Sequence, residues 1–205
     1  EEGAEGIAEE TPEVEEVAAS VLRAMEELAP QEEAPAAVEG AEEIAVGAPE
    51  EMPVTVEEAE FDEAKRLVAL GEWERLAAMG SRALDQLIEA LEDEKSDTRR
   101  GAAWALGVIR DRRAAQALIP LLEDPDNSVR RGAAWALGVI GDEAATLPLT
   151  LSLRDEDAEV RRKTAWALGE IGDTRAIGPL EQALKDPDED VRRVALLVLE
   201  RLGWS

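Results

Sequence analysis

The 205-residue chain has no histidine, no cysteine and no tyrosine, and its aromatic residues are one phenylalanine and five tryptophans. Without histidine it offers no imidazole general base, no Ser-His-Asp triad and no histidine ligand for zinc or non-haem iron. Without cysteine it offers no thiolate nucleophile, no cysteine-bound metal site and no disulfide. These absences predict a protein with no catalytic residues, no metal site and no cofactor.

Long apolar runs are absent as well. No stretch approaches the roughly 18 apolar residues that a membrane span needs, and no signal-peptide pattern opens the chain. Hydrophobic residues make up 45% of the chain but aromatic residues only 3%, which predicts a core of Ala, Leu, Val and Ile. We therefore expect a soluble, cytoplasmic protein with no membrane partner.

Negative charge is concentrated near the N-terminus. Residues 1–60 hold 20 Glu, no Asp and the single basic residue Arg23, a net charge of −19 out of −26 for the whole chain. Residues 61–205 hold the other 28 acids and 21 bases, a net charge of −7. A segment rich in Glu, Ala, Pro and Gly and poor in aromatics is typical of disorder. The sequence predicts a largely disordered acidic tail over residues 1–54.

One stretch of this tail has a helical pattern. Thr11 can cap a helix with Pro12 in its first turn, and Pro30 ends the pattern, which predicts an amphipathic helix at about residues 12–29. Its apolar residues recur at spacings of three and four: Val14, Val17, Val21, Met25 and Leu28. Two interpretations remain open, a weak helix that folds back on the rest of the protein and a helix that docks in a partner's groove.

Beyond the tail the chain repeats itself. Residues 99–109, RRGAAWALGVI, recur unchanged at 130–140 and, at eight of eleven positions, at 161–171, so both copies are offset by the same interval. A fixed period in this range indicates stacked supersecondary units. A capping-box spacing that starts at Thr55 predicts where the ordered structure begins.

Each unit has the pattern of two helices. In the third unit we expect Asp124 to cap the first helix, Pro125 to take its first position and Gly141 to end it. Asp142 is then expected to cap a second helix that runs to about Arg154. The apolar residues follow the helical period with no strand-like alternation, so the predicted fold is all-α.

The pattern D-P-D-x-x-V-R-R-x-A-A-W-A-L-G-x-I-G-D, which residues 124–142 show in full, resembles the HEAT-like repeats of phycobiliprotein lyases and of artificial repeat libraries. The resemblance implies a right-handed α-solenoid over residues 55–205, built from two-helix repeats of about 31 residues each. Its expected units are a divergent first repeat at about 55–93, repeats at about 94–124, 125–155 and 156–186, and a terminal half-repeat at 187–205.

The same resemblance implies that the first helix of each repeat lines an inner wall that binds partners. On that helix Arg131, Trp135 and Val139 lie on the flank away from the apolar stripe. The same positions in the other repeats are Arg100, Trp104, Val108, Arg162, Trp166, Glu170 and Arg193. Arg and Trp often anchor interfaces, so we predict a non-catalytic scaffold that binds a protein or peptide through an exposed Arg and Trp row. In the alternative, equally open, each Trp covers the neighbouring repeat.

Other charged residues have structural interpretations. We expect Arg99, Arg130, Arg161 and Arg192 to pair between units with acids such as Asp111, Asp142 or Asp173. The acidic loops 124–128 and 186–190 resemble the start of a calcium loop but lack its glycine and its final glutamate. These loops are therefore interpreted as helix caps and not as metal sites.

Three further hypotheses concern function and partners. A phycobilin-lyase-like activity, or another accessory role on a protein substrate, follows from the family alone, whereas the related iron-dependent deoxyhypusine hydroxylases need histidines that this chain lacks. An anionic-ligand or nucleic-acid binder fits the four regularly spaced Arg but conflicts with the net charge of −26. The apolar helix expected at residues 187–202 predicts self-association.

Overall fold

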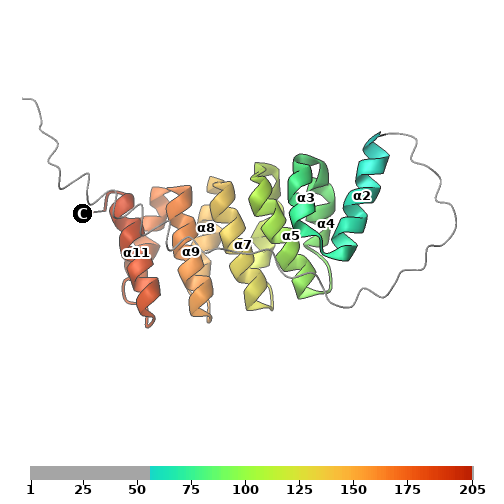
Figure 1. Cartoon of the computed structure of the whole chain (residues 1–205). Helices are drawn as coiled ribbons and strands as arrows, with labels where there is room; N and C mark the ends of the chain where they lie inside the picture. The colour runs from blue at the N-terminus through green and yellow to red at the C-terminus, as the bar shows by residue number, and fades with distance from the viewer. Residues whose placement is uncertain (1–55, 205) are drawn as a thin grey trace, which may run out of the picture. The chain divides into compact units, whose positions relative to one another are not determined.

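The structure is a computed structural model that describes residues 56–204 (Figure 1). The expected amphipathic helix at residues 12–29 and the acidic tail lie outside the described residues. Within residues 56–204 the chain is helical and has no strand, so the predicted all-α class is confirmed.

Longer α-helices alternate with short helices that open in 3₁₀ turns. The α-helices are α2 (Val56–Leu70), α3 (Trp73–Met79), α4 (Leu84–Ala90), α5 (Ser96–Ile109), α6 (Ala115–Leu118), α7 (Asn127–Ile140), α8 (Thr146–Ser152), α9 (Ala158–Ile171), α10 (Ile177–Ala183) and α11 (Glu189–Arg201). The 3₁₀ turns are η1 (Gly80–Ala83), η2 (Arg112–Ala114), η3 (Ile119–Glu123), η4 (Glu143–Ala145) and η5 (Thr174–Ala176).

These helices form two rows. Helices α5, α7, α9 and α11 contact one another in chain order, and Figure 1 shows them side by side. The second row consists of α4, α6 with η3, α8 and α10, and α8 is seen behind α7 and α9. Each repeat contributes one helix to each row, so the predicted solenoid is confirmed.

Helix ends in the third repeat follow the sequence pattern only in part. Helix α7 ends at Gly141, whose φ of 69° is the left-handed conformation that glycine adopts most readily, as predicted. Its N-cap is Asp126, whose carboxylate accepts the N–H of Ser128 at 2.9 Å, so the expectation of Asp124 as cap is wrong. Asp124 instead accepts two hydrogen bonds from Arg99. Pro125 therefore precedes the cap and does not take the first helical position.

The second helix of that repeat is also shorter than expected. Asp142 caps it, as predicted, by accepting the N–H of Ala144 at 2.9 Å. Helix α8 then ends at Ser152, before the expected end at Arg154.

The first unit is interrupted where the later units are continuous. Helix α2 begins at Val56, next to the predicted start at Thr55, and the chain breaks at Gly71 (φ 70°) before Trp73 opens α3. Trp73 is 3% exposed, and its ring lies on Gly101 of α5, where an added Cβ would be 2.1 Å from Cε2 of the indole. The divergent first unit thus uses a buried tryptophan to cover the second.

Helices of the first row meet at glycine positions. A Cβ added to Gly138 of α7 would lie 2.8 Å from the Cα of Ala167 in α9, and one on Gly169 would lie 2.7 Å from Cγ2 of Val198 in α11. Both distances are shorter than van der Waals contact. Alanines also line these helix–helix interfaces, and Ala134 and Ala165 are fully buried. Neighbouring helices therefore approach one another closely at these glycines and alanines.

Candidate partner-binding face

Close packing leaves a single strip of α7 accessible. Among residues 129–140 every residue is buried except Arg131, Trp135 and Val139. These residues are four positions apart, so they lie in line along one side of the helix. This is the strip that the sequence predicted to face away from the core.

The neighbouring helices present equivalent strips beside it. Arg100 and Trp104 are half-buried and Val108 is 44% exposed on α5, while Arg193 is exposed on α11. Because α5, α7, α9 and α11 adjoin in order, their strips form one surface, which we call the Arg–Trp face. Its members are Arg100, Trp104, Val108, Arg131, Trp135, Val139, Arg162, Trp166, Glu170 and Arg193.

The tryptophan row is not uniformly exposed. Trp104 and Trp135 are half-buried, but Trp166 is only 7% exposed, so the expectation of three exposed indoles is wrong at Trp166. Lys163 occupies the position that is glycine in the two preceding repeats, and its Nζ lies 5.9 Å from the centroid of the Trp166 ring. The Lys163 ammonium thus lies within cation–π range of that indole.

Two of the indoles also pack between repeats. A Cβ on Gly107 would lie 2.5 Å from Cζ3 of Trp135, and one on Gly138 would lie 3.0 Å from Cζ3 of Trp166. Each ring thus rests on a glycine of the preceding helix. The inter-repeat packing interpretation holds for these two residues, while the accessible part of Trp135 still belongs to the surface.

Charge on the Arg–Trp face is mostly balanced along each helix. Arg100 donates to Asp97 at 2.8 Å and Arg193 to Asp190 at 2.7 Å, and Arg162 donates to Glu159 in the same way. In each pair the acid stands three residues before the arginine. The equivalent position on α7 is Ser128, and α7 contains no acidic residue. On α5, α9 and α11 the arginine of the face is therefore held by an acid of its own helix.

The first arginine of each pair has a structural role, as predicted. Arg130 donates from Nε and Nη2 to the two carboxylate oxygens of Asp155 at 2.7 and 2.9 Å, and both side chains are 9% exposed. The same paired bonds join Arg99 to Asp124 and Arg161 to Asp186. Bidentate contacts of this kind are among the strongest polar contacts in proteins.

The expected acidic partners of these arginines are wrong. Asp111, Asp142 and Asp173 instead cap the 3₁₀ turns that open the second-row helices, each accepting a backbone N–H two residues later. Hydrogen bonds from Arg175, from the backbone and from Thr146 hold the pKa of Asp173 at about 2. The true partners could have been found from spacing, because each of these three bonded arginines is followed by its aspartate at the same interval along the chain.

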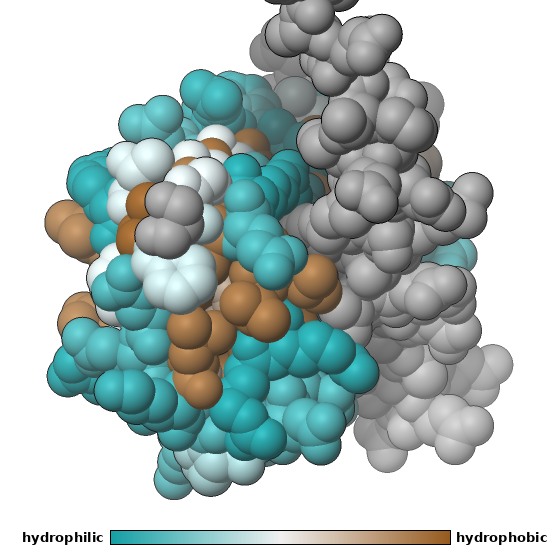
Figure 2. Space-filling view, turned by 90° about the vertical axis from the view of Figure 1, so that its left-hand side faces the viewer, coloured by the Kyte–Doolittle hydropathy of each residue, from teal (hydrophilic) through white to brown (hydrophobic). Residues whose placement is uncertain are grey.

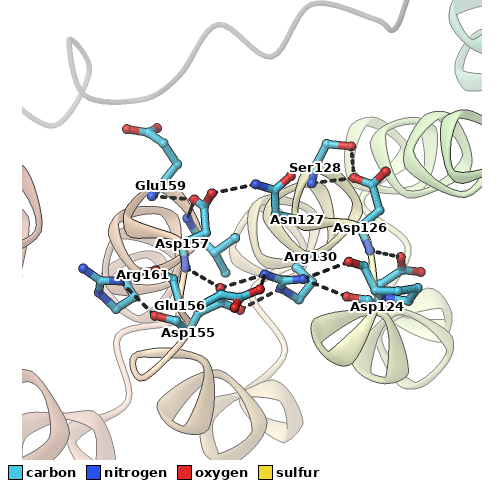
Figure 3. Close-up of polar contacts among 12 residues, drawn as sticks. Asp124, Asp126, Asn127, Ser128, Arg130, Asp155, Glu156, Asp157, Glu159 and Arg161 are labelled. Carbon is cyan, nitrogen blue, oxygen red and sulfur yellow. Dashed lines mark hydrogen bonds and ion pairs between the residues drawn. The ribbon is translucent and has the colours of Figure 1, made fainter.

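These bonds continue from repeat to repeat as a ladder (Figure 3). Arg130 donates through Nη1 to the carbonyl of Asp124 at 2.9 Å while its other nitrogens hold Asp155. Arg161 joins the carbonyl of Asp155 to the carboxylate of Asp186 in the same way. Burial acts to raise the pKa of Asp186, but hydrogen bonds from Arg161 and from the N–H of Asp188 outweigh it and lower that pKa.

Comparison with known proteins assigns the fold to a family. The family model of HEAT repeats matches residues 62–138, 84–155 and 146–203, and the chain belongs to this family. No curated protein sequence matches the chain.

Solved structures share the fold. The complex of CpcE and CpcF of phycocyanin lyase from Nostoc sp. is 28% identical, with a TM-score of 0.62 over 80% of this chain and 71% of that chain. Human deoxyhypusine hydroxylase is 29% identical, with a TM-score of 0.53 over 60% of this chain and 44% of that one. A designed armadillo repeat protein in complex with a peptide has a TM-score of 0.55 at 18% identity over 94% of this chain and 95% of that chain, which shows the fold alone.

Other kinds of site were sought in the described residues. None of the helices within residues 56–204 has the length and hydrophobicity needed to span a bilayer. In the same residues no three acidic side chains come together as a potential metal site. The loops 124–128 and 186–190 supply the helix caps Asp126 and Asp188, as predicted.

The ladder yields a direct prediction for stability. Asp155→Ala leaves the buried Arg130 guanidinium without its carboxylate, and we expect the free energy of unfolding to fall by about 3 kcal/mol, measured by urea denaturation. The control Asp190→Ala breaks an ion pair whose side chains are 57% and 52% exposed and should cost under about 1 kcal/mol. Equal effects of the two substitutions would contradict a structural role for the ladder.

Proposed function

We propose that the protein is a non-catalytic scaffold that binds a protein or peptide partner through the Arg–Trp face. One observation carries this proposal: the accessible side chains in the body of α7 are an arginine, a tryptophan and a valine in line. Arg and Trp are the residue types most enriched among the energetic anchors of interfaces.

Contacts within the protein hold the side chains of the Arg–Trp face in place in the absence of a partner. Trp135 rests on Gly107, so a partner that covers the rest of this indole immobilises no additional rotamer. Arg100 and Arg162 are likewise held by acids of their own helices. Binding to a preorganised surface avoids much of the side-chain entropy that flexible contacts lose.

Charge indicates the chemistry of the partner. The regularly spaced arginines of the Arg–Trp face and the half-buried indoles of Trp104 and Trp135 favour a segment that combines carboxylates with apolar side chains. Nucleic acid is disfavoured because it carries a phosphate charge at every nucleotide, which the net charge of −26 repels more strongly than the few carboxylates of a short peptide.

The Nostoc structure supports a protein partner. It is a complex of two proteins of a phycocyanin lyase, and it shares part of its sequence as well as its fold with this chain. Enzymatic function has less support, since the chain has no histidine or cysteine and its described residues hold no metal-binding cluster.

Selection from a random peptide library tests this function. Full-length protein should enrich peptides rich in acidic and apolar residues, and Val108→Glu combined with Arg131→Glu should weaken most of them at least tenfold. Leu147→Gln combined with Leu151→Gln, in the second row of helices, is the control and should leave bound the peptides that the first pair of changes weakens. Failure to enrich any peptide, or enrichment insensitive to the first pair of changes, would contradict the proposal.

We also propose self-association through the C-terminal helix at residues 187–202. Figure 2 shows apolar side chains gathered at this end of the described residues. Leu196 is 42% exposed, whereas its equivalents Ala103, Ala134 and Ala165 are fully buried by the next helix. Arg192 bonds the carbonyls of Asp186 and Pro187, as Arg130 does in its own repeat.

The contact between two copies of the chain must differ from the packing of neighbouring first-row helices within one chain. Glu200 stands where Gly107, Gly138 and Gly169 allow close packing, so a further helix cannot approach α11 as closely. We therefore expect a weak dimer.

Sedimentation across a range of concentrations should show this dimer, and Leu196→Lys should abolish it without loss of helix content. A monomer at the highest concentration that stays soluble would contradict self-association.

A further inference from the structure

The second row of helices carries an apolar patch that the sequence analysis did not identify. Leu147 and Leu151 of α8 are 59% and 69% exposed, more than any other large hydrophobic residue among those described. They are one helical turn apart and therefore lie on the same side of α8. Two adjacent exposed leucines form a patch, which single scattered ones do not.

The fold does not require leucine at either position. The equivalent residues in the other repeats are Asp85 and Glu89, Gln116 and Pro120, and Gly178 and Gln182. The patch is therefore particular to one repeat and is not a property of the solenoid.

A groove runs along this patch. It has a volume of about 790 Å³ between η3 and α8, and its apolar lining includes Ile119, Pro120 and Leu122 besides the two leucines. A second hollow of about 260 Å³ on the α10 side shares Leu151 with it. Leu151 thus stands between two hollows, and Leu147 lines the larger of them.

Basic residues line the two hollows. Arg154 lines both hollows and is exposed, and Lys185 lines the smaller one. Two acids of the larger groove, Asp124 and Asp155, are already bound by Arg99 and Arg130. Glu123 is the remaining acid of its lining.

We propose that this groove docks an amphipathic helix of a partner protein whose apolar stripe is flanked by carboxylates. Apolar residues spaced by three and four on such a helix would fill the two hollows beside Leu151, and a carboxylate beyond the stripe would meet Arg154 and Lys185. The groove lies on the second row of helices and the Arg–Trp face on the first. The proposal for the groove is therefore independent of the proposal for the Arg–Trp face.

Binding of a designed probe tests the groove. The probe is a fluorescein-labelled helical peptide of about five turns, with Leu along one stripe and Glu elsewhere, and its matched control has Lys in place of every Glu. Titrations by fluorescence anisotropy use the full-length chain with Val108→Glu and Arg131→Glu, the two changes that weaken the Arg–Trp face, and are repeated on the unmodified chain. We expect the acidic probe to bind at least tenfold more tightly than the basic one.

Variants of the groove borrow residues from the other repeats, so that folding is preserved. Leu147→Gln with Leu151→Gln copies Gln116 and Gln182 and should weaken the acidic probe at least tenfold, because burial of both leucines is lost. Arg154→Glu copies Glu123 and should weaken it several-fold, with a smaller effect at high salt. Gln116→Ala, an exposed position outside the lining of both hollows, is the control and should change binding less than twofold.

Three results would overturn the proposal. They are no binding of the acidic probe at millimolar concentration, equal binding of the acidic and basic probes, and unchanged affinity after both leucines are replaced.

Discussion

Neighbouring helices of the first row can lie against one another only because no Cβ stands between them at one position in each joint. Gly107, Gly138 and Gly169 provide that contact, and Ala134 and Ala165 extend it. A stack held so closely has no freedom to rotate its helices. Each helix must therefore turn the same side outward, and the Arg–Trp face follows from that constraint.

Two adjacent arginines show how strict the arrangement is. Arg130 is buried in the joint, where it links the carbonyl of Asp124 to the carboxylate of Asp155, whereas Arg131 points along the accessible strip. The buried member orients neighbouring repeats and the accessible member is offered to partners. Consecutive residues on a helix are about 100° apart, which is sufficient to give identical side chains different roles.

The sequence predicted most of the fold, because its internal repeat is visible without any coordinates. It also predicted the accessible strip of α7, since helical periodicity alone separates Trp135 from the buried alanines. It did not predict the burial of Trp166, whose ring packs on Gly138 and lies near Nζ of Lys163. It assigned the cap of α7 to Asp124, because two aspartates compete in the same loop and only their contacts distinguish them. The patch at Leu147 and Leu151 was missed because apolar residues in a helix are ordinarily taken as core.

The most direct test of the close stacking compares two glycines of the same helix. Gly138→Ala places a methyl group 2.8 Å from the backbone of Ala167, whereas the nearest atom to a methyl group at Gly132 is Cγ of Arg100 at 3.7 Å. The account predicts that Gly138→Ala lowers the free energy of unfolding in urea by about 1–3 kcal/mol. Gly132→Ala should leave it unchanged or raise it by up to about 1 kcal/mol. Equal changes for the two variants, or a stabilised Gly138→Ala protein, would contradict the stacking on which the proposed face depends.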